Sequence, residues 1–238
     1  MVPDPFGRAL RDFHRDEQDE PLRQRDGEDV REHPVESFYF DEVDPEAERT
    51  RWLESHLDGP LLDLGAGVGR DARYFQRQFE TVAVEVSAPL VETMRARGVD
   101  DARPGDLFAL RETFERDRFR SVLCYGTQLG LTKSPQGLRR VLSDLARVTT
   151  PDATAVVDNY DPRREPASDL LGYRDDPTRG VAFRVMQFEY EDEVGETLLF
   201  RLCSPDRLRE ATVGTGWTVV DVEYTEDAHY VAALEKLA

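Results

Sequence analysis

The hydrophobic pattern of the central part of the chain alternates between two periods. Short apolar runs that suit buried strands occur five times, and stretches with an apolar residue every three or four positions separate them. The predicted strands lie within 60–67, 81–87, 99–106, 120–130 and 153–160, and the predicted helices within 70–79, 89–98, 108–119 and 134–150. This alternation predicts an α/β fold with an open parallel sheet and helices on both faces.

The pattern changes after residue 160. Two apolar segments flank the acidic turn EDEVG and predict an antiparallel hairpin over about 181–203. We expect one side of this hairpin to be apolar, with Phe183, Val185, Phe188 and Tyr190. The hairpin would cover a substrate, form a dimer surface or extend the sheet, and the sequence leaves these roles open.

Both ends of the chain add to this plan. Residues 204–216 predict a helix with Ser204 as N-cap, and 217–224 and 229–237 predict two closing strands. A further helix is expected after Asp44, with Pro45 in its first turn and Asp58-Gly59 at its end. Pro151 and Asp152 predict a turn. Residues 1–34 are charged and predict either a frayed amphipathic helix or a loosely ordered tail.

The chain carries a large excess of acid. Its 49 Asp and Glu outnumber its 31 Lys and Arg, the formal net charge is −18, and the only lysines are Lys133 and Lys236. Excess acid keeps a protein solvated where salt screens charge strongly. We expect a cytoplasmic protein from a high-salt organism; the alternative is an ordinary acidic protein from a GC-rich genome. DNA is disfavoured as a partner, because phosphate binding needs a basic face.

Short patterns exclude other classes. The sequence has no long apolar run and no signal-peptide core, so no membrane partner is expected. Cys124 and Cys203 lie in apolar segments and are expected to be core residues. No metal is expected, because no closely spaced Cys/His set occurs.

The segment LLDLGAGVGR at 61–70 predicts a strand that runs into a nucleotide-binding glycine loop. Gly65, Gly67 and Gly69 have the spacing GxGxG. A dinucleotide fingerprint needs its third glycine at the next position, which is Arg70. The dinucleotide pattern therefore fails at its last position.

Two acidic residues lie downstream of the loop. Glu85 ends the second predicted strand, where a carboxylate can accept hydrogen bonds from ribose hydroxyls, and Asp106 follows the third. With Asp63 and the glycines, in this order and spacing, they resemble the site of class I S-adenosylmethionine-dependent methyltransferases. The resemblance covers about 45–160 and 204–236 and implies S-adenosyl-L-methionine as the cofactor. The implied cofactor-binding residues are Asp63, Gly65, Ala66, Gly67, Glu85, Val86, Asp106, Leu107 and Tyr125.

The resemblance also implies residue roles and a fold. Asp63 would lie near the methionine amino group, Glu85 would bind the ribose, and Asp106 would accept a hydrogen bond from the adenine. The fold would be a Rossmann-like, seven-stranded, mostly parallel sheet with an antiparallel last strand and an inserted β-hairpin lid. The domain would span 41–238, with the insertion at about 161–203, and residues 1–40 would be a charged segment and partial lid.

Residues after the fourth predicted strand are expected near the methyl group. The chain has Tyr125-Gly126-Thr127-Gln128 there, where nucleic acid amino-methyltransferases carry [DN]PP[YF], which argues against DNA methylation. The weak catalytic candidates are Tyr125, Gln128 and Tyr160. Further candidates are Asn159 and Asp161 for the acceptor site and His33 and Tyr39 for the lid, whereas His56 is expected to be structural and His229 to lie on the ligand side but displaced along the sheet.

We expect methyl transfer to a small-molecule acceptor. An RNA or protein acceptor and a cofactor-binding regulator without transfer activity remain alternatives, and an NAD-dependent oxidoreductase is a weaker one. The sequence predicts neither the oligomeric state nor the acceptor atom.

The charge balance generates a first prediction. Because salt screens the repulsion among the excess carboxylates, the unfolding temperature should rise between about 0.1 M and 2 M KCl. Thermal unfolding followed by circular dichroism measures this. Greatest stability at low ionic strength, with loss of structure in molar KCl, would contradict the high-salt interpretation.

Overall fold

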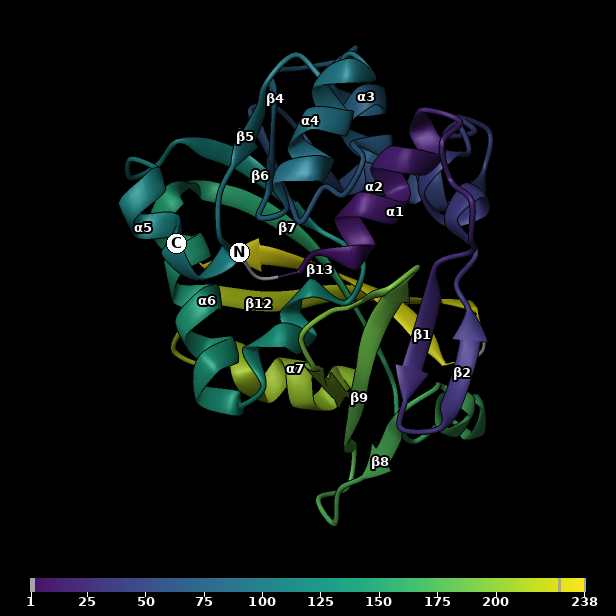
Figure 1. Ribbon diagram of the computed structural model, residues 1–238. Coiled ribbons are helices and arrows are strands. Elements are labelled where there is room, and N and C mark those ends of the chain that lie inside the picture. The colour runs from purple at the N-terminus through teal and green to yellow at the C-terminus, as the bar shows by residue number, and fades with distance from the viewer. Residues whose placement is uncertain (1–2, 227, 238) are drawn as a thin grey trace.

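The main sheet of the protein has seven strands in the order β12-β13-β7-β6-β3-β4-β5 (Figure 1). The computed structural model describes residues 3–226 and 228–237. The strands are β3 (Leu61–Leu64), β4 (Thr81–Glu85), β5 (Ala102–Pro104), β6 (Phe119–Cys124), β7 (Thr149–Tyr160), β12 (Trp217–Glu226) and β13 (His229–Lys236). The pairs from β5 to β7 are parallel, and β13 runs antiparallel to both β7 and β12. The predicted reversed last strand is confirmed.

Helices cover both faces of this sheet, as the alternating pattern predicts. They are α2 (Glu48–His56), α3 (Arg70–Phe75), α4 (Ala88–Ala96), α5 (Leu110–Thr113), α6 (Pro135–Val148) and α7 (Pro205–Thr212). The apolar faces of α5, α6 and α7 share one core with Leu62 and Val122. On the opposite face, α2 and α3 pack with Leu61 and Leu123, whereas α4 packs with Ala83. Adjacent leucines of β3 therefore enter different cores, as the alternation of side chains along a strand requires.

Two predicted boundaries are wrong. Helix α2 begins at Glu48 with Ala47 as N-cap, because Asp44 instead accepts a hydrogen bond from the Glu46 N–H at 2.9 Å and stabilises a preceding turn. Pro151 and Asp152 lie inside β7 rather than in a turn. A register irregularity between β6 and β7 accommodates these residues, so the strand continues through them.

A second sheet lies beside the first and contains the predicted hairpin (Figure 1). Its strands are β1 (Arg23–Asp26), β2 (Asp29–Glu32), β8 (Tyr173–Asp175), β9 (Val181–Tyr190), β10 (Glu193–Val194) and β11 (Leu198–Cys203). β9 pairs antiparallel with β11, which confirms the hairpin, and also with β1 and β8. The sequence pattern did not predict β1 and β2, whose residues are all polar except Val30 and are half-buried or exposed.

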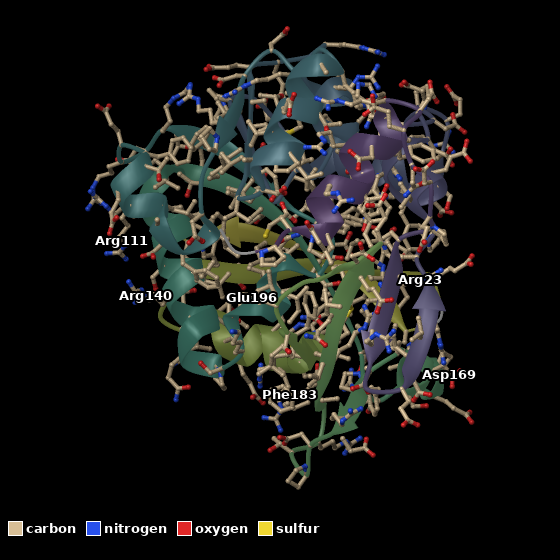
Figure 2. All side chains as sticks on the ribbon, viewed as in Figure 1. Arg23, Arg111, Arg140, Asp169, Phe183 and Glu196 are labelled. Atoms are coloured by element: carbon tan, nitrogen blue, oxygen red, sulfur yellow. The ribbon has the colours of Figure 1, made fainter. Side chains whose placement is uncertain are left out.

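The predicted apolar side of the hairpin is also wrong. Phe188 and Tyr190 pack in a core with the N-terminal segment. Phe183 and Val185, at odd positions of the same strand, lie opposite Arg201 and Leu199 on the other face (Figure 2 labels Phe183). Side chains alternate between the faces of a strand, so the four residues cannot share one side.

The N-terminal segment is ordered rather than a loose tail. Helix α1 (Pro5–His14) begins after Asp4, whose carboxylate accepts a hydrogen bond from the Gly7 N–H. The fully buried Leu10 and Leu22 share a core with Leu90 of α4 and Tyr190 of β9. The segment therefore joins the second sheet to the glycine-loop side of the main sheet.

The remaining side-chain features concern the cysteines and the charged surface. Cys124 and Cys203 are buried free thiols. Within residues 3–226 and 228–237, no group of three or more His, Cys, Asp or Glu could hold a metal ion. No helix in these ranges is long and apolar enough to cross a membrane. Charged side chains of both signs project from the outside of the molecule, among them Arg111 and Arg140 (Figure 2).

Docking of the N-terminal segment generates a second prediction. Leu22→Ala should lower the free energy of unfolding by about 2–5 kcal/mol, because it leaves a cavity in a closed core. Val30→Ala, at a site 39% exposed in the same segment, should change it by less than about 0.5 kcal/mol. Urea unfolding of both variants measures this. Equal small effects would show that the segment is not part of the folded core.

Candidate functional site

The glycine loop after β3 lies at the carboxyl edge of the main sheet, where it leads into α3. Gly65, Gly67 and Gly69 all adopt left-handed backbone conformations, with φ of +68°, +58° and +77°. A β-carbon on Gly65 would lie 2.5 Å from Cδ of Gln128, and one on Gly69 would lie 2.5 Å from Cγ2 of Val99. Gly65 therefore admits the Gln128 side chain, and Gly69 allows α3 to pack closely against its neighbours.

Glu85 lies at the end of β4, at the same carboxyl edge of the main sheet. Its side chain is buried, and its carboxylate accepts hydrogen bonds from three backbone N–H groups. Oε2 accepts one from Gly67 at 3.1 Å, whereas Oε1 accepts those of Val86 and Ser87 at 2.8 and 3.1 Å. Burial raises the pKa of Glu85, and these hydrogen bonds oppose the rise. Because a carboxylate oxygen can accept two hydrogen bonds, Oε2 retains capacity for a ligand hydroxyl.

Asp106 lies at the neighbouring strand end. Pro104 of β5 pairs with Glu85, and the Gly105 N–H donates to the Glu85 carbonyl at 3.0 Å. Asp106 then accepts a hydrogen bond from the Phe108 N–H at 2.8 Å. Two large apolar side chains are exposed at this edge: Val86 at 75% and Phe108 at 45%. The half-buried Leu107 lies between Asp106 and Phe108.

The side chain of Asp63 lies within β3 and is buried. Burial raises the pKa of Asp63 well above its ordinary value, and the charges of Asp71 and Glu85 add to the rise. Asp71 instead forms a two-pronged ion pair with Arg49, with both N–O distances at 3.1 Å. The Arg49 guanidinium also stacks over the Tyr125 ring, 4.4 Å from its centroid. Arg49 thus positions Tyr125 from α2, which the sequence analysis did not anticipate.

A second buried carboxylate holds the segment after β6. Asp158 accepts hydrogen bonds from the backbone N–H groups of Gly126 and Thr127 at 3.1 and 2.8 Å, and it lies 2.8 Å from Nε2 of His229. The His229 ring contacts the rings of Tyr125 and Tyr160, with centroids 5.7 and 5.0 Å apart. His229 therefore lies on the ligand side, as expected, and its position on β13, beyond β7, displaces it along the sheet from the glycine loop.

The other sequence candidates have structural partners. The Asn159 amide is buried and donates to the Arg201 carbonyl, which ties β7 to β11. The Asp161 carboxylate pairs with Arg163 and accepts a hydrogen bond from the Tyr224 hydroxyl at 2.7 Å. His56 packs on Trp52, and its Nε2 lies 3.4 Å from Asp221, in keeping with the predicted structural role.

Residues 36–40 pass over the glycine loop. Cδ1 of Tyr39 lies 3.9 Å from the position of a β-carbon on Gly67. Arg97 donates to the carbonyls of both Tyr39 and Val68 at 3.1 Å, and Arg70 donates to the Phe38 carbonyl at 3.2 Å. Arg70, which replaces the third dinucleotide glycine, therefore fastens this segment to the loop.

A chain of hydrogen bonds leads from Tyr39 to the second sheet. The Tyr39 hydroxyl lies 2.8 Å from Nε2 of His33, and Nδ1 of His33 lies 2.8 Å from Nε2 of Gln24. Oε1 of Gln24 accepts a hydrogen bond from Nη2 of Arg184 at 2.7 Å. The sequence analysis named His33 and Tyr39 but missed Gln24 and Arg184, because nothing in the local pattern marks residues that meet across two strands.

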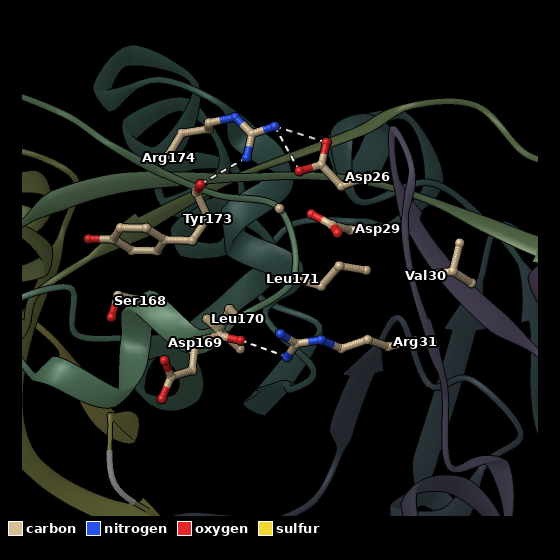
Figure 3. Close-up of a pocket in the computed structure, with 11 residues that line it drawn as sticks. Asp26, Asp29, Val30, Arg31, Ser168, Asp169, Leu170, Leu171, Tyr173 and Arg174 are labelled. Atoms are coloured by element: carbon tan, nitrogen blue, oxygen red, sulfur yellow. Dashed lines mark hydrogen bonds and ion pairs between the residues drawn. The ribbon is translucent and has the colours of Figure 1, made fainter.

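Two surface hollows of the described chain lie away from the glycine loop. One of about 320 Å³ lies between the β1–β2 turn and residues 168–174, where Arg174 pairs with Asp26 and Arg31 donates to the Asp169 carbonyl (Figure 3). Another of about 450 Å³ is lined by residues of the N-terminal segment, including Phe13, Leu22 and His33. Neither includes the glycine loop.

The buried His33 generates a third prediction. Burial, with the nearby Arg184 charge, lowers the pKa of His33 from 6.5 to about 4. The folded state therefore binds fewer protons than the unfolded state. The resulting stabilisation is complete above about pH 6.5 and is lost as the pH falls through about 4, at a cost of up to about 3 kcal/mol.

Nuclear magnetic resonance titration of the His33 ring protons measures this pKa. His33→Gln should reduce the loss of stability between pH 6.5 and 4, while His56→Gln serves as the control. A pKa of His33 near 6.5 would contradict the buried network.

The comparison with protein families matches the part of the chain that carries the candidate site. Residues 61–152 match the family model described as "Methyltransferase domain", a range that contains the glycine loop, Glu85 and Asp106. No curated protein matches the chain.

Solved structures resemble all or most of the chain. A SAM-dependent methyltransferase from Bacteroides fragilis, in complex with S-adenosyl-L-homocysteine, is similar over 100% of this chain and 98% of its own, with 23% identity and a TM-score of 0.81. A 1,6-didemethyltoxoflavin-N1-methyltransferase from Burkholderia thailandensis is similar over 75% of this chain and 71% of its own, with 20% identity and a TM-score of 0.52.

An amino pentose methyltransferase from Micromonospora echinaspora has 18% identity and a TM-score of 0.52, over 73% of this chain and 82% of its own. The fold of this chain is therefore that of the S-adenosylmethionine-dependent methyltransferases, and its residues 61–152 match a methyltransferase domain.

Proposed function

We propose that this protein transfers the methyl group of S-adenosylmethionine to a small-molecule acceptor. The observation that carries the proposal is the Glu85 carboxylate, which three backbone N–H groups hold at the end of β4, directly beside the left-handed glycine loop. A carboxylate in this place suits the paired hydroxyls of a ribose. The Bacteroides fragilis relative, whose structure contains S-adenosyl-L-homocysteine, supports the same cofactor.

The residues of the edge fit the parts of such a nucleoside. Gly67 presents bare backbone beside Tyr39, in a left-handed conformation that would strain any other residue. Asp106 offers carboxylate oxygens to the adenine amino group, and the exposed Val86 and Phe108 offer apolar surface to a planar base. On the other side of the loop, Asp63, Gly65 and Ala66 would face the methionine part. We assign the parts of the nucleoside in this way because β3, β4 and β5 end side by side in this order at the carboxyl edge.

Bound S-adenosylmethionine supplies a methyl group already activated by its positive sulfur. The protein then has to bring the acceptor atom into line with that group and exclude water. Tyr125, held by Arg49, and Gln128, lying over Gly65, are placed to orient the reactants. Tyr160 lies close to Tyr125, because the His229 ring contacts both tyrosine rings. Tyr125 keeps its proton at neutral pH, since burial raises the pKa of its hydroxyl to about 12.

A small acceptor is favoured over a macromolecule. The second sheet and residues 36–40 cover the carboxyl edge, so a bulky substrate would have to displace packed structure. Two of the structural relatives carry names of enzymes for small molecules, a toxoflavin precursor and an amino pentose. The acidic composition supports a cytoplasm rich in salt as the working environment.

Glu85 provides a test of the cofactor assignment. Glu85→Ala should weaken binding of S-adenosylhomocysteine by about 1.5–3 kcal/mol, because it removes a charged acceptor of ribose hydrogen bonds. Isothermal titration calorimetry measures the affinity, with Glu112→Gln at an exposed position of α5 as the control. Thermal unfolding of Glu85→Ala checks that the loop still folds.

Unchanged affinity in Glu85→Ala would refute the ribose assignment. Stabilisation of the wild-type protein by NAD alone would refute the cofactor. Binding of S-adenosylhomocysteine without methyl transfer to any compound of a metabolite extract would favour a non-catalytic regulator.

A further inference from the structure

Arg184 is a guanidinium without a countercharge at the edge of the proposed site. It lies on β9, half-buried, and makes no ion pair with any carboxylate of the described residues. Its Nε donates to the Leu171 carbonyl at 3.0 Å and its Nη2 to Oε1 of Gln24 at 2.7 Å. Two neutral oxygens thus orient the group without compensating its charge.

Leaving a partly desolvated charge unpaired costs stability. The cost is unexpected here, because the chain has 49 acidic residues and pairs many other arginines with them. Burial lowers the pKa of Arg184, yet a guanidinium stays protonated at neutral pH. The position of Arg184 therefore points to an anion that is not part of the chain.

The neighbours of Arg184 connect it to the methyl-transfer side. Its charge acts on Tyr160, at the end of β7, and on Tyr39, beside Gly67. The further charge that acts on it is another cation, Arg31. His33 contributes no charge at neutral pH, because its pKa lies at about 4. The charged groups that act most strongly on Arg184 therefore include no carboxylate, whereas Glu85 acts on Tyr39.

The hydrogen-bond chain also has a direction. Because Oε1 of Gln24 accepts from Arg184, its Nε2 is the donor to Nδ1 of His33. Neutral His33 then carries its proton on Nε2 and donates it to the Tyr39 oxygen. Tyr39 consequently directs its own hydroxyl proton elsewhere, and burial keeps that proton in place by raising its pKa. Arg184 and Tyr39 therefore each retain a donor for a ligand: the Nη1 group of Arg184 and the hydroxyl of Tyr39.

We propose that Arg184, with Tyr39, binds a carboxylate of the methyl acceptor. This inference depends on the proposed function and names the substrate class for it: a small molecule with a carboxylate and a separate nucleophilic atom. One guanidinium compensates one negative charge, which matches a carboxylate; a phosphate monoester would bring about 1.5–2 charges toward Glu85. The methyl group goes to the nucleophilic atom, which forms the new C–N or C–O bond and loses its proton to solvent water. The C–S bond breaks with its electron pair on sulfur.

The test uses the full-length protein, methyl-labelled S-adenosylmethionine and a metabolite extract in three forms. One portion is untreated, a second is amidated with carbodiimide and methylamine to neutralise carboxylates, and a third is treated with phosphatase. Labelled product should form from the untreated and phosphatase-treated portions and be lost from the amidated one. Label that persists after amidation, or disappears after phosphatase treatment, would overturn the carboxylate.

Variants assign the effect to the residue. Arg184→Gln should lower kcat/KM for the labelled acceptor about 10- to 100-fold, and Arg184→Lys less, while the affinity for S-adenosylhomocysteine stays within about twofold of wild type. Arg140→Gln, at an exposed position of α6, is the matched control. Unchanged transfer in Arg184→Gln would refute the role of Arg184. A wild-type protein that fails to bind S-adenosylhomocysteine would instead refute the proposed function.

Discussion

The buried carboxylate of Glu85 determines how the parts of this protein meet. Desolvation of a carboxylate is costly, and three backbone N–H groups offset the cost. One of these groups comes from the glycine loop and two from the start of α4, so the loop and the helix are held at one point. The Ser87 hydroxyl, two residues on, donates to Asp4 at 2.5 Å, and Asp4 caps α1. The N-terminal segment is therefore positioned by the same junction that would hold the ribose.

This junction explains why the second sheet lies where it does. Helix α1 packs against α4 on one side and against β9 on the other, so it transmits the position of the glycine loop to the hairpin. Arg70 and Arg97 fasten residues 36–40 to the loop through backbone carbonyls. Arg184 is thereby brought near Tyr39 and Tyr160, although the three residues come from separate parts of the sequence. The proposed cofactor site therefore lies on the main sheet, whereas Arg184, the residue proposed to bind the methyl acceptor, lies on the second sheet.

Local patterns predicted the elements better than their partners. The apolar stripe of α6 and the left-handed glycines follow from side-chain periodicity and backbone sterics, which act over a few residues. The start of α2 was misplaced, because Asp44 could cap either a helix or a turn. β1 and β2 were missed because Val30 is their single apolar residue, so they show no hydrophobic period. Backbone hydrogen bonds pair β1 with β9 and with β2. His229 was expected on the ligand side, but its contact with Tyr125 depends on the pairing of β13 with β7, which no local pattern shows.

The resemblance to methyltransferases implied the reversed last strand. The sequence by itself determined the central α/β alternation and the glycine spacing GxGxG followed by Arg70. These features depend on spacing within short segments. Only the tertiary structure decided that an N-terminal segment would complete the second sheet and that Gln24 would bridge His33 and Arg184. Such contacts join residues far apart along the chain and arise from the packing of α1 between two layers. The local sequence around a polar residue does not show which distant charged group it will contact in the folded protein.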